Sequence, residues 1–295
     1  GRSDFGFRIS DFGLPLRGNE KMFRIWFFIF SIRNPQSTIR NLIKAKPMKK
    51  ICIFANQKGG VGKTACTVNI GFELVRRGRS VLLVDIDSQG NLTSWAGFDP
   101  DSFSATIYDV MKGTRTVEEV MVRVNDAVSL LPANILLASV EREIFAAIGY
   151  ERILKKALQP VLDRFDHILL DAPPSLGALT VNGLVASEEV YITVACEHLS
   201  VIGTNKLLET IDAIRENYNP RLEIGRVIPT MYSNTVLANE MLRQLGAFFG
   251  EKVTKTVIRR NVKIGESSAM GQSVIHYDPD SIGAKDFESL VEELA

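Results

Sequence analysis

The segment Asn56–Ala65, NQKGGVGKTA, combines the residue types that hold a phosphate chain, and it directly follows a short apolar run. Its three glycines let the backbone wrap closely around an anion, and the N–H groups that open the next helix would point at that anion. Lys63 is expected to contact the β- and γ-phosphates, and the Thr64 hydroxyl is expected to ligate Mg²⁺. The spacing therefore predicts a P-loop that binds a nucleoside triphosphate.

Carboxylates stand at the ends of two other apolar runs. In Val84–Asn91, Asp85 and Asp87 occupy alternate positions, so their side chains face opposite ways along an extended chain. A second apolar run ends at Asp171, where two prolines follow one residue later. We expect Asp171 to support Mg²⁺ near Thr64, and Asp85 to hold Mg²⁺ or its water shell. The predicted metal-binding residues are Thr64, Asp85 and Asp171.

The P-loop departs from the general pattern at two neighbouring positions. Gln57 stands where a glycine is usual, and a second lysine, Lys58, precedes the glycines. In this Lys-Gly-Gly-x-Gly-Lys-Thr form the sequence resembles the ParA/MinD family of P-loop ATPases, and within it the small ParA (Soj-like) partition ATPases. The resemblance runs from about Met48 to Leu294. It implies hydrolysis of ATP to ADP and phosphate, with ATP and Mg²⁺ as cofactors.

The resemblance also assigns roles to single residues. Lys58 would reach across a nucleotide-sandwich dimer to the partner's phosphates, and Asp87 would orient the attacking water. Together with Lys63, these residues form the predicted catalytic set. Ser88 replaces a proline that is usual in the family, so we expect a looser turn there. The plainer alternatives are that Lys58 is a solvated loop lysine and that Asp87 caps a loop.

Two later segments, Thr230–Tyr232 and Val257–Asn261, fall where the family holds the adenine, and they place Met231 and Arg260 beside the base. The full set of predicted nucleotide contacts is Lys58, Gly59, Gly60, Val61, Gly62, Lys63, Thr64, Ala65, Met231 and Arg260.

DNA-binding members of the family carry basic residues near the C-terminal surface of the dimer. The best local match is a set of basic residues beside Glu251, and an ordinary solvated surface is the alternative. The set consists of Lys252, Lys255, Arg259, Arg260 and Lys263. Relatives usually have an Asp and an Arg in the loop after the Met-Tyr pair. This chain has Ser233–Thr235 there, without an arginine, so a weaker DNA affinity or another surface is an open alternative.

The resemblance favours a partition ATPase in the cytoplasm, associated with the nucleoid. ATP would drive formation of a homodimer, the dimer would bind DNA non-specifically, and a ParB-like or cargo-adaptor protein would trigger hydrolysis. Such a protein would segregate a chromosome or plasmid, or position another cargo. Three alternatives share the fold: an ATPase with a metabolic or redox role, a MinD-like positioning ATPase, and a non-enzymatic, nucleotide-gated adaptor.

Cysteine spacing and C-terminal charge bear on these alternatives. Cys52, Cys66 and Cys196 lie far apart, so no pair is suited to an iron–sulfur cluster on a dimer surface. The last twelve residues, 284–295, contain four acidic residues and one lysine. An anionic bilayer would repel such a segment, so we expect no stable membrane association.

Strand-like and helix-like segments alternate from Met48 onward and must position these residues. Continuous apolar runs, typical of strands buried on both faces, predict strands at Ile51–Ala55, Val81–Ile86, His167–Leu170, Val190–Val194 and Val227–Thr230. Helical spacing predicts helices at Ala65–Arg77, Ile135–Ala147, Leu176–Ala186, Gly203–Asn217 and Leu237–Phe249. This alternation predicts an α/β fold, a doubly wound, mostly parallel sheet with helices on both faces. Ligands of such sheets bind beyond the carboxyl ends of the strands.

Residues 1–47 differ from the body in charge and pattern. They contain nine Lys/Arg and three Asp/Glu, whereas residues 48–295 contain 26 and 31, so a mildly acidic body follows a basic segment. The apolar run Met22–Ile32 is too short to span a membrane and has no clear period. We expect 1–47 to be an extension without fixed structure, or upstream sequence that is not native, and 48–295 to be one P-loop ATPase domain. The alternative for Phe23–Ile32 is an amphipathic anchor for a membrane or a partner.

Overall fold

The computed structural model describes residues 50–145, 147–196 and 204–294, all of them within the unit Ala45–Ala295. The predicted extension 1–47 lies outside the described residues, as does Gly203 at the start of one predicted helix. The strands are β1 (Ile51–Ala55), β2 (Val81–Asp85), β3 (Val122–Arg123), β4 (Val128–Leu131), β5 (His167–Asp171), β6 (Glu189–Ala195) and β7 (Glu223–Thr230). The α-helices are α2 (Lys63–Arg76), α3 (Asn91–Trp95), α4 (Ile107–Lys112), α5 (Val117–Val120), α6 (Leu137–Ile144), α7 (Ile153–Leu158), α8 (Ala178–Ala186), α9 (Asn205–Asn217), α10 (Val236–Phe249), α11 (Val262–Ala269), α12 (Val274–Tyr277) and α13 (Ile282–Leu294).

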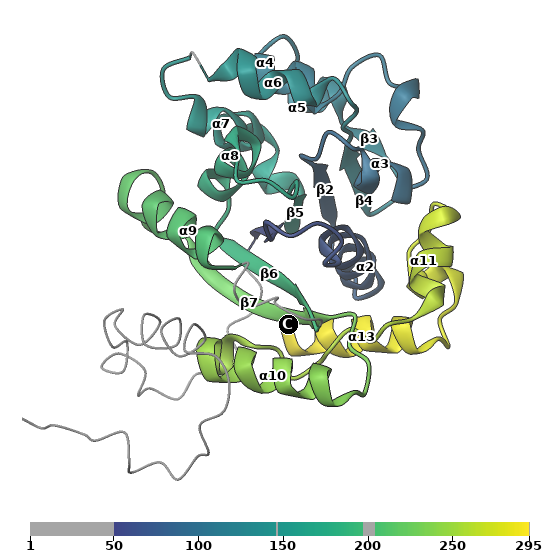
Figure 1. Cartoon of the computed structure of the whole chain (residues 1–295). Coiled ribbons are helices and arrows are strands. Elements are labelled where there is room, and N and C mark those ends of the chain that lie inside the picture. Colours follow the sequence, from purple (N-terminus) through teal and green to yellow (C-terminus); the bar gives the residue numbers. More distant parts are fainter. Residues whose placement is uncertain (1–49, 146, 197–203, 295) are drawn as a thin grey trace, which may run out of the picture. The chain divides into compact units, whose positions relative to one another are not determined.

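The strands form one seven-stranded sheet in the order β3-β4-β2-β5-β1-β6-β7. All neighbouring strands are parallel except β3 and β4, which pair antiparallel at one edge. Because β1 lies between β5 and β6, the loops that follow these three strands open at the same edge of the sheet (Figure 1). The predicted α/β fold with a doubly wound, mostly parallel sheet is confirmed.

Side chains alternate between the two faces of the sheet, as the period of a strand requires. In β1, Cys52 and Phe54 pack into one apolar cluster, whereas Ile53 and Ala55 pack into the other. The first cluster is covered by α2, α3 and α11–α13, and the second by α4–α10. Figure 1 shows this division, with α2 and α13 on one side of the strands and α8 and α9 on the other.

Most long elements agree with the sequence prediction to within a few residues, whereas the short elements and the 13-residue helix α13 were not predicted. β7 begins at Glu223, four residues before the predicted strand, and α6 is shorter at both ends than predicted. β4 and α13 were not predicted as parts of the core. In α13 the apolar side chains Phe287, Leu290 and Val291 are fully buried. Their burial depends on packing against α2, which the local charge of the segment does not reveal.

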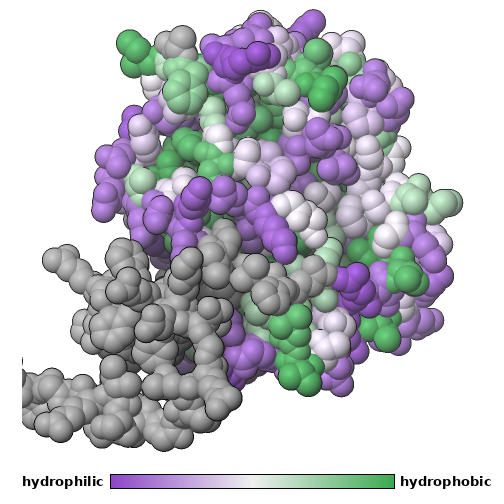
Figure 2. Space-filling model, in the orientation of Figure 1, coloured by the Kyte–Doolittle hydropathy of each residue, from purple (hydrophilic) through white to green (hydrophobic). Residues whose placement is uncertain are grey.

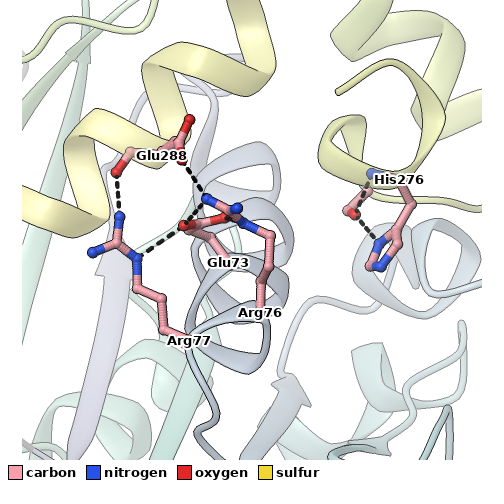
Figure 3. Close-up of polar contacts among 6 residues, drawn as sticks. Glu73, Arg76, Arg77, His276 and Glu288 are labelled. Atoms are coloured by element: carbon pink, nitrogen blue, oxygen red, sulfur yellow. Dashed lines mark hydrogen bonds and ion pairs between the residues drawn. The ribbon is translucent and has the colours of Figure 1, made fainter. Parts of the chain in front are cut away.

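An ion-pair cluster fastens α13 to the P-loop helix (Figure 3). Glu73, whose side chain is fully buried in α2, accepts hydrogen bonds from Arg76 Nε at 2.7 Å and Arg77 Nε at 2.9 Å. Both arginines also donate hydrogen bonds to Glu288 of α13. Arg76 donates to its carboxylate, and Arg77 donates to its backbone carbonyl. A buried carboxylate is tolerated only with such partners, so the cluster fixes the end of α2 against α13.

Replacement of Glu73 by alanine should destabilise the domain by about 1–3 kcal/mol, because Arg76 and Arg77 lose a buried acceptor and α2 loses part of its connection to α13. The free energy of unfolding in urea measures the change. Glu240→Ala is the matched control, since Glu240 forms the same type of pair with Arg243 on an exposed helix face. The urea midpoint of the Glu240→Ala variant should stay close to that of the unmutated protein. Equal losses in the two variants would contradict the structural role of the buried cluster.

Candidate nucleotide-binding site

A cavity of about 530 Å³ opens at the carboxyl edge of the sheet, between the P-loop and the segment before α11. This volume lies within the range of small-molecule sites. Hydrogen bonds from the neighbouring strands hold the loop in place. Asn56 Nδ2 donates to the Thr193 carbonyl of β6 at 2.7 Å, and Thr230 Oγ1 at the end of β7 donates to the Val61 carbonyl at 2.9 Å. The predicted glycine-rich segment is therefore a cradle built on three adjacent strands.

The P-loop glycines have the geometry that an anion cradle requires. Gly60 and Gly62 have φ of 70° and 81°, a left-handed region that strongly favours glycine. Gly62 directly precedes α2, so the free N–H groups of the first helical turn face the cavity. Of the ten predicted nucleotide contacts, eight line this cavity: Gly59, Gly60, Gly62, Lys63, Thr64, Ala65, Met231 and Arg260.

Lys63 supplies a cation at the floor of the cavity. Its side chain is buried, and Nζ donates a weak hydrogen bond of 3.4 Å to the Lys58 carbonyl. Burial lowers the pKa of Lys63, and attraction to Asp171 and Asp87 opposes that shift. A buried ammonium without a close anionic partner gains most from a bound phosphate. This environment fits the predicted contact with the phosphate chain.

Thr64 and Asp171 form the hydroxyl–carboxylate pair that the sequence predicted. Thr64 Oγ1 donates to Asp171 Oδ2 at 2.6 Å, and Thr67 Oγ1 lies 3.4 Å from the other carboxylate oxygen. Asp171 is fully buried at the end of β5. Burial, together with the nearby carboxylate of Asp85, raises the pKa of Asp171 to about 8. A divalent cation held beside Thr64 would favour the charged form of this carboxylate.

The residues present fit Mg²⁺ by the chemistry of their donors. Hydroxyl and carboxylate oxygens are the hard ligands that Mg²⁺ prefers, and it commonly takes only one or two of them alongside substrate phosphates and water. In the described parts of the chain, no cluster of three or more His, Cys, Asp and Glu side chains could hold a metal ion without such help. The site therefore suits a metal that arrives with the nucleotide.

Asp85 occupies a different environment from Asp171. Its Oδ2 accepts hydrogen bonds from the backbone N–H of Thr93 at 2.9 Å and from the Thr93 hydroxyl at 2.8 Å, and its Oδ1 accepts from the N–H of Asp87 at 3.1 Å. Burial raises the pKa of Asp85 to about 7. These bonds hold the loop between β2 and α3 and favour a structural role. The metal role predicted for Asp85 stays a prediction.

Asp87 lines the cavity and also shapes its own loop. Its Oδ1 accepts the N–H of Gln89 at 3.0 Å, and its carbonyl accepts the N–H of Gly90 at 3.0 Å. The turn expected to be loose at Ser88 is thus closed by two hydrogen bonds. Both alternatives for Asp87 are compatible with this geometry, because the carboxylate caps the loop and faces the cavity.

Lys58 differs from Lys63 in exposure. Lys58 is exposed, and its backbone N–H donates to Asn56 Oδ1 at 3.0 Å, which fixes the backbone of the loop. The side chain is outside the set that lines the cavity of the same chain. An exposed lysine at the rim is what a contact with a second chain would require.

The wall predicted to face the adenine comes from two segments joined by backbone hydrogen bonds. Tyr232 N–H donates to the Ile258 carbonyl at 3.0 Å, and Arg260 N–H donates to the Tyr232 carbonyl at 2.9 Å. Met231, the residue before Tyr232, has φ of 51°, the one positive value at a non-glycine residue in the described chain. Such strain persists where surrounding structure enforces it, often at ligand sites. The sequence placed Met231 and Arg260 here, and both line the cavity.

The five predicted DNA contacts do not form one unpaired basic patch. Arg259 is bound to Asp286, and Lys263 Nζ lies 2.7 Å from Glu266 Oε2. Arg259 and Arg260 line the nucleotide cavity. Lys252 and Lys255 are exposed on the segment after α10. The DNA role stays a prediction, and these two lysines lie outside the set of residues that line the cavity.

Several cavity residues were missed by the sequence reading. Pro174 was noted only as one of the two prolines that follow Asp171, yet it lines the cavity beside the P-loop. Thr230 lies in the segment Thr230–Tyr232 predicted near the adenine but was not among the predicted contacts, although it ends an apolar strand at the predicted ligand edge. Five further lining residues come from short helices that the sequence did not predict, namely Asn91, Trp95, Ile264, Gly265 and Ser268.

A family model described as an AAA domain matches residues 48–224. Among curated proteins, the chromosome-partitioning ATPase Soj of Treponema pallidum is 40% identical over 250 residues, which cover 84% of this chain and 97% of that protein. The chromosome partitioning protein ParA of Caulobacter vibrioides is 35% identical over 256 residues, covering 85% and 96%.

Solved structures share the fold. Cobyrinic acid a,c-diamide synthase from Mycobacterium smegmatis, with a bound ATP analogue and magnesium, is 34% identical with a TM-score of 0.73, and the match covers 83% of this chain and 93% of that one. The ATP complex of a Cyanothece McdA variant is 20% identical with a TM-score of 0.75, covering 84% and 97%. At that identity the second likeness establishes the fold alone.

The two buried carboxylates should respond differently to neutralisation. Asp171→Asn removes the charge beside Thr64, so the Mg²⁺ concentration for half-maximal nucleotide binding should rise about tenfold or more. Asp85→Asn alters only the hydrogen bonds of its loop. The Mg²⁺ concentration for half-maximal binding should therefore stay within about threefold of the value for the unmutated protein. Fluorescence of a labelled nucleotide, titrated with Mg²⁺, measures both. An equal rise in the two variants would show that Asp85 also holds the metal.

Proposed function

Because this chain belongs to the Soj/ParA family of P-loop ATPases, we propose that it is a partition ATPase whose ATP-bound form is a dimer that binds DNA. The chain hydrolyses ATP, with Mg²⁺ as its metal cofactor. The observation that carries the proposal is the pairing of a complete phosphate site around Lys63 and Thr64 with an exposed second lysine, Lys58, at its rim. In this arrangement, Lys58 of each chain would contact the nucleotide bound to another chain.

The hydrolytic mechanism rests on positioning. Lys63 and the N–H groups of the first turn of α2 bind the phosphates, and Thr64 with Asp171 holds the metal. Bound Mg²⁺ supplies charge neutralisation on the phosphate oxygens. Asp87 orients the attacking water, because its carboxylate faces the cavity while Gln89 fixes its rotamer. Lys58 of a second chain adds the positive charge that a loose phosphoryl transition state requires.

The surface around the cavity supports association with a second copy. α11 lines the cavity through Ile264 and Gly265, while Val262 and Met270, at its two ends, are exposed to 74% and 62%. Figure 2 shows hydrophobic residues among hydrophilic ones over the region of α11. Other exposed apolar residues follow the carboxyl ends of β4 and β7: Ile135, Leu136, Val236 and Leu237. Apolar surface at an open ligand edge is typical of a protein interface.

DNA binding is proposed through Lys252 and Lys255. A body with an excess of acidic residues repels DNA on average, so the affinity must come from local charge that two aligned chains would double. An activator of the ParB or cargo-adaptor kind would then control hydrolysis, and the protein would associate with the nucleoid. The relatives named as chromosome-partitioning proteins support this proposal.

The alternatives find less support. The likeness to cobyrinic acid a,c-diamide synthase keeps a metabolic ATPase open, and the ATP site serves either role. For a redox role, the three cysteines are buried, and burial raises the pKa of the Cys196 thiol to about 11. Buried, protonated thiols are poor cluster ligands.

A MinD-like role would require an apolar helix face that can bind a membrane. The apolar face of α13 is buried in the core and is unavailable to a membrane. No helix within the described ranges combines the length and the apolar character that crossing a bilayer requires.

Three substitutions separate nucleotide binding, dimerisation and hydrolysis. Asp87→Ala should bind ATP and accumulate as a long-lived dimer, because only the water-orienting group is lost. Lys58→Ala should bind ATP as a monomer, and Lys63→Ala should lose ATP binding. Size-exclusion chromatography with light scattering, run with ATP and Mg²⁺, measures the mass, and a labelled nucleotide reports binding. A monomeric Asp87→Ala protein that holds ATP tightly would count against the sandwich mechanism.

A further inference from the structure

Arg259 and Asp286 form a close pair at the base-side wall of the nucleotide cavity. Asp286 on α13 is buried, with an exposed fraction of 5%. Its carboxylate accepts the backbone N–H of Arg259 at 2.9 Å and the guanidinium Nε at 3.0 and 3.1 Å, and it also contacts a terminal guanidinium nitrogen. One carboxylate thus fixes both the backbone and the side chain of a residue that lines the cavity.

This contact determines what Arg259 can offer a ligand. The carboxylate binds the guanidinium along its edge and neutralises its charge, so the group is poorly suited to bind phosphate. The flat faces of a guanidinium held in this way remain available to pack against an aromatic ring. The hydrogen bonds also restrict the rotamers of a long side chain, which removes part of the entropy that ligand binding would otherwise have to overcome.

We propose that Asp286 is a positioning residue that holds Arg259 as a wall for the purine base of the nucleotide. The wall is rigid because its backbone is paired on both sides of Arg259: Ile258 N–H donates to the Pro229 carbonyl at 2.9 Å, and Arg260 N–H donates to the Tyr232 carbonyl at 2.9 Å. The phosphates lie at the other end of the cavity, at Lys63 and Thr64. Asp286 therefore acts on the base and leaves the reacting phosphate to the P-loop.

The same helix carries two carboxylates that serve as internal comparisons. Glu288 binds Arg76 at the end of α2 (Figure 3), and Glu293 accepts the N–H groups of Lys255 and Thr256 at 2.8 and 2.9 Å. These partners are outside the set of residues that line the nucleotide cavity. If α13 had only a structural role, loss of Asp286, Glu288 or Glu293 would affect nucleotide binding in the same way.

The test compares the affinity for ATP with the affinity for tripolyphosphate, which has no base. Asp286→Asn should raise the Kd for ATP about tenfold and leave the Kd for tripolyphosphate within about twofold, as measured by calorimetry. Arg259→Gln, at a half-exposed side chain, should give the same pattern without burying a new group. In steady-state assays the loss should fall on KM for ATP and much less on kcat.

Glu288→Gln is the control on the same helix. It should lower the melting temperature slightly and leave both dissociation constants in place. The proposal is overturned if Asp286→Asn and Arg259→Gln retain the ATP affinity of the unmutated protein. It is also overturned if ATP and tripolyphosphate weaken together, or if Glu288→Gln weakens ATP as much as Asp286→Asn. Each result is independent of DNA binding, so failure of the partition proposal would leave it intact.

Discussion

The hydrogen bond between the Thr64 hydroxyl and the Asp171 carboxylate joins the two parts of the chain that make the catalytic site. It ties the first turn of α2 to the end of β5, and β5 lies beside β1, which leads into the P-loop. Asp171 is also close enough to attract Lys63, so one buried carboxylate organises the cation, the hydroxyl and the predicted metal position. The rest of the sheet holds the ends of β1 and β5 side by side.

The sequence predicted the parts of the site that local pattern determines. Lys63 and Thr64 stand out because glycine spacing and an adjoining helix define an anion cradle without reference to the rest of the fold. Asp171 was predictable because it ends a continuous apolar strand. The buried strands were predictable for the same reason, since a run of apolar residues bounded by polar ones has few alternatives in a parallel sheet.

The remainder depends on contacts between residues far apart in the chain. Asp85 and Asp171 look alike in sequence, and only the position of Thr93 separates a loop-holding carboxylate from one beside the P-loop. Arg259 was predicted as a DNA contact because it lies among basic residues, and its ion pair with Asp286, 27 residues later, could not be predicted from that local pattern. The C-terminal segment was assessed from the sequence only by its acidic charge, whereas in the structure its carboxylates bind Arg76 of α2 and the backbone of Arg259.

The central claim is that ATP converts this chain into a DNA-binding dimer, and equilibrium DNA binding by the unmutated protein tests it most directly. Affinity for a random-sequence duplex is measured with ATP and with ADP across a range of salt concentrations. Two lysines from each of two chains make about four phosphate contacts, which predicts a log–log salt slope near −3.6 with ATP and negligible affinity with ADP. No affinity with ATP even at low salt, or the same affinity in ATP and ADP, would contradict the account.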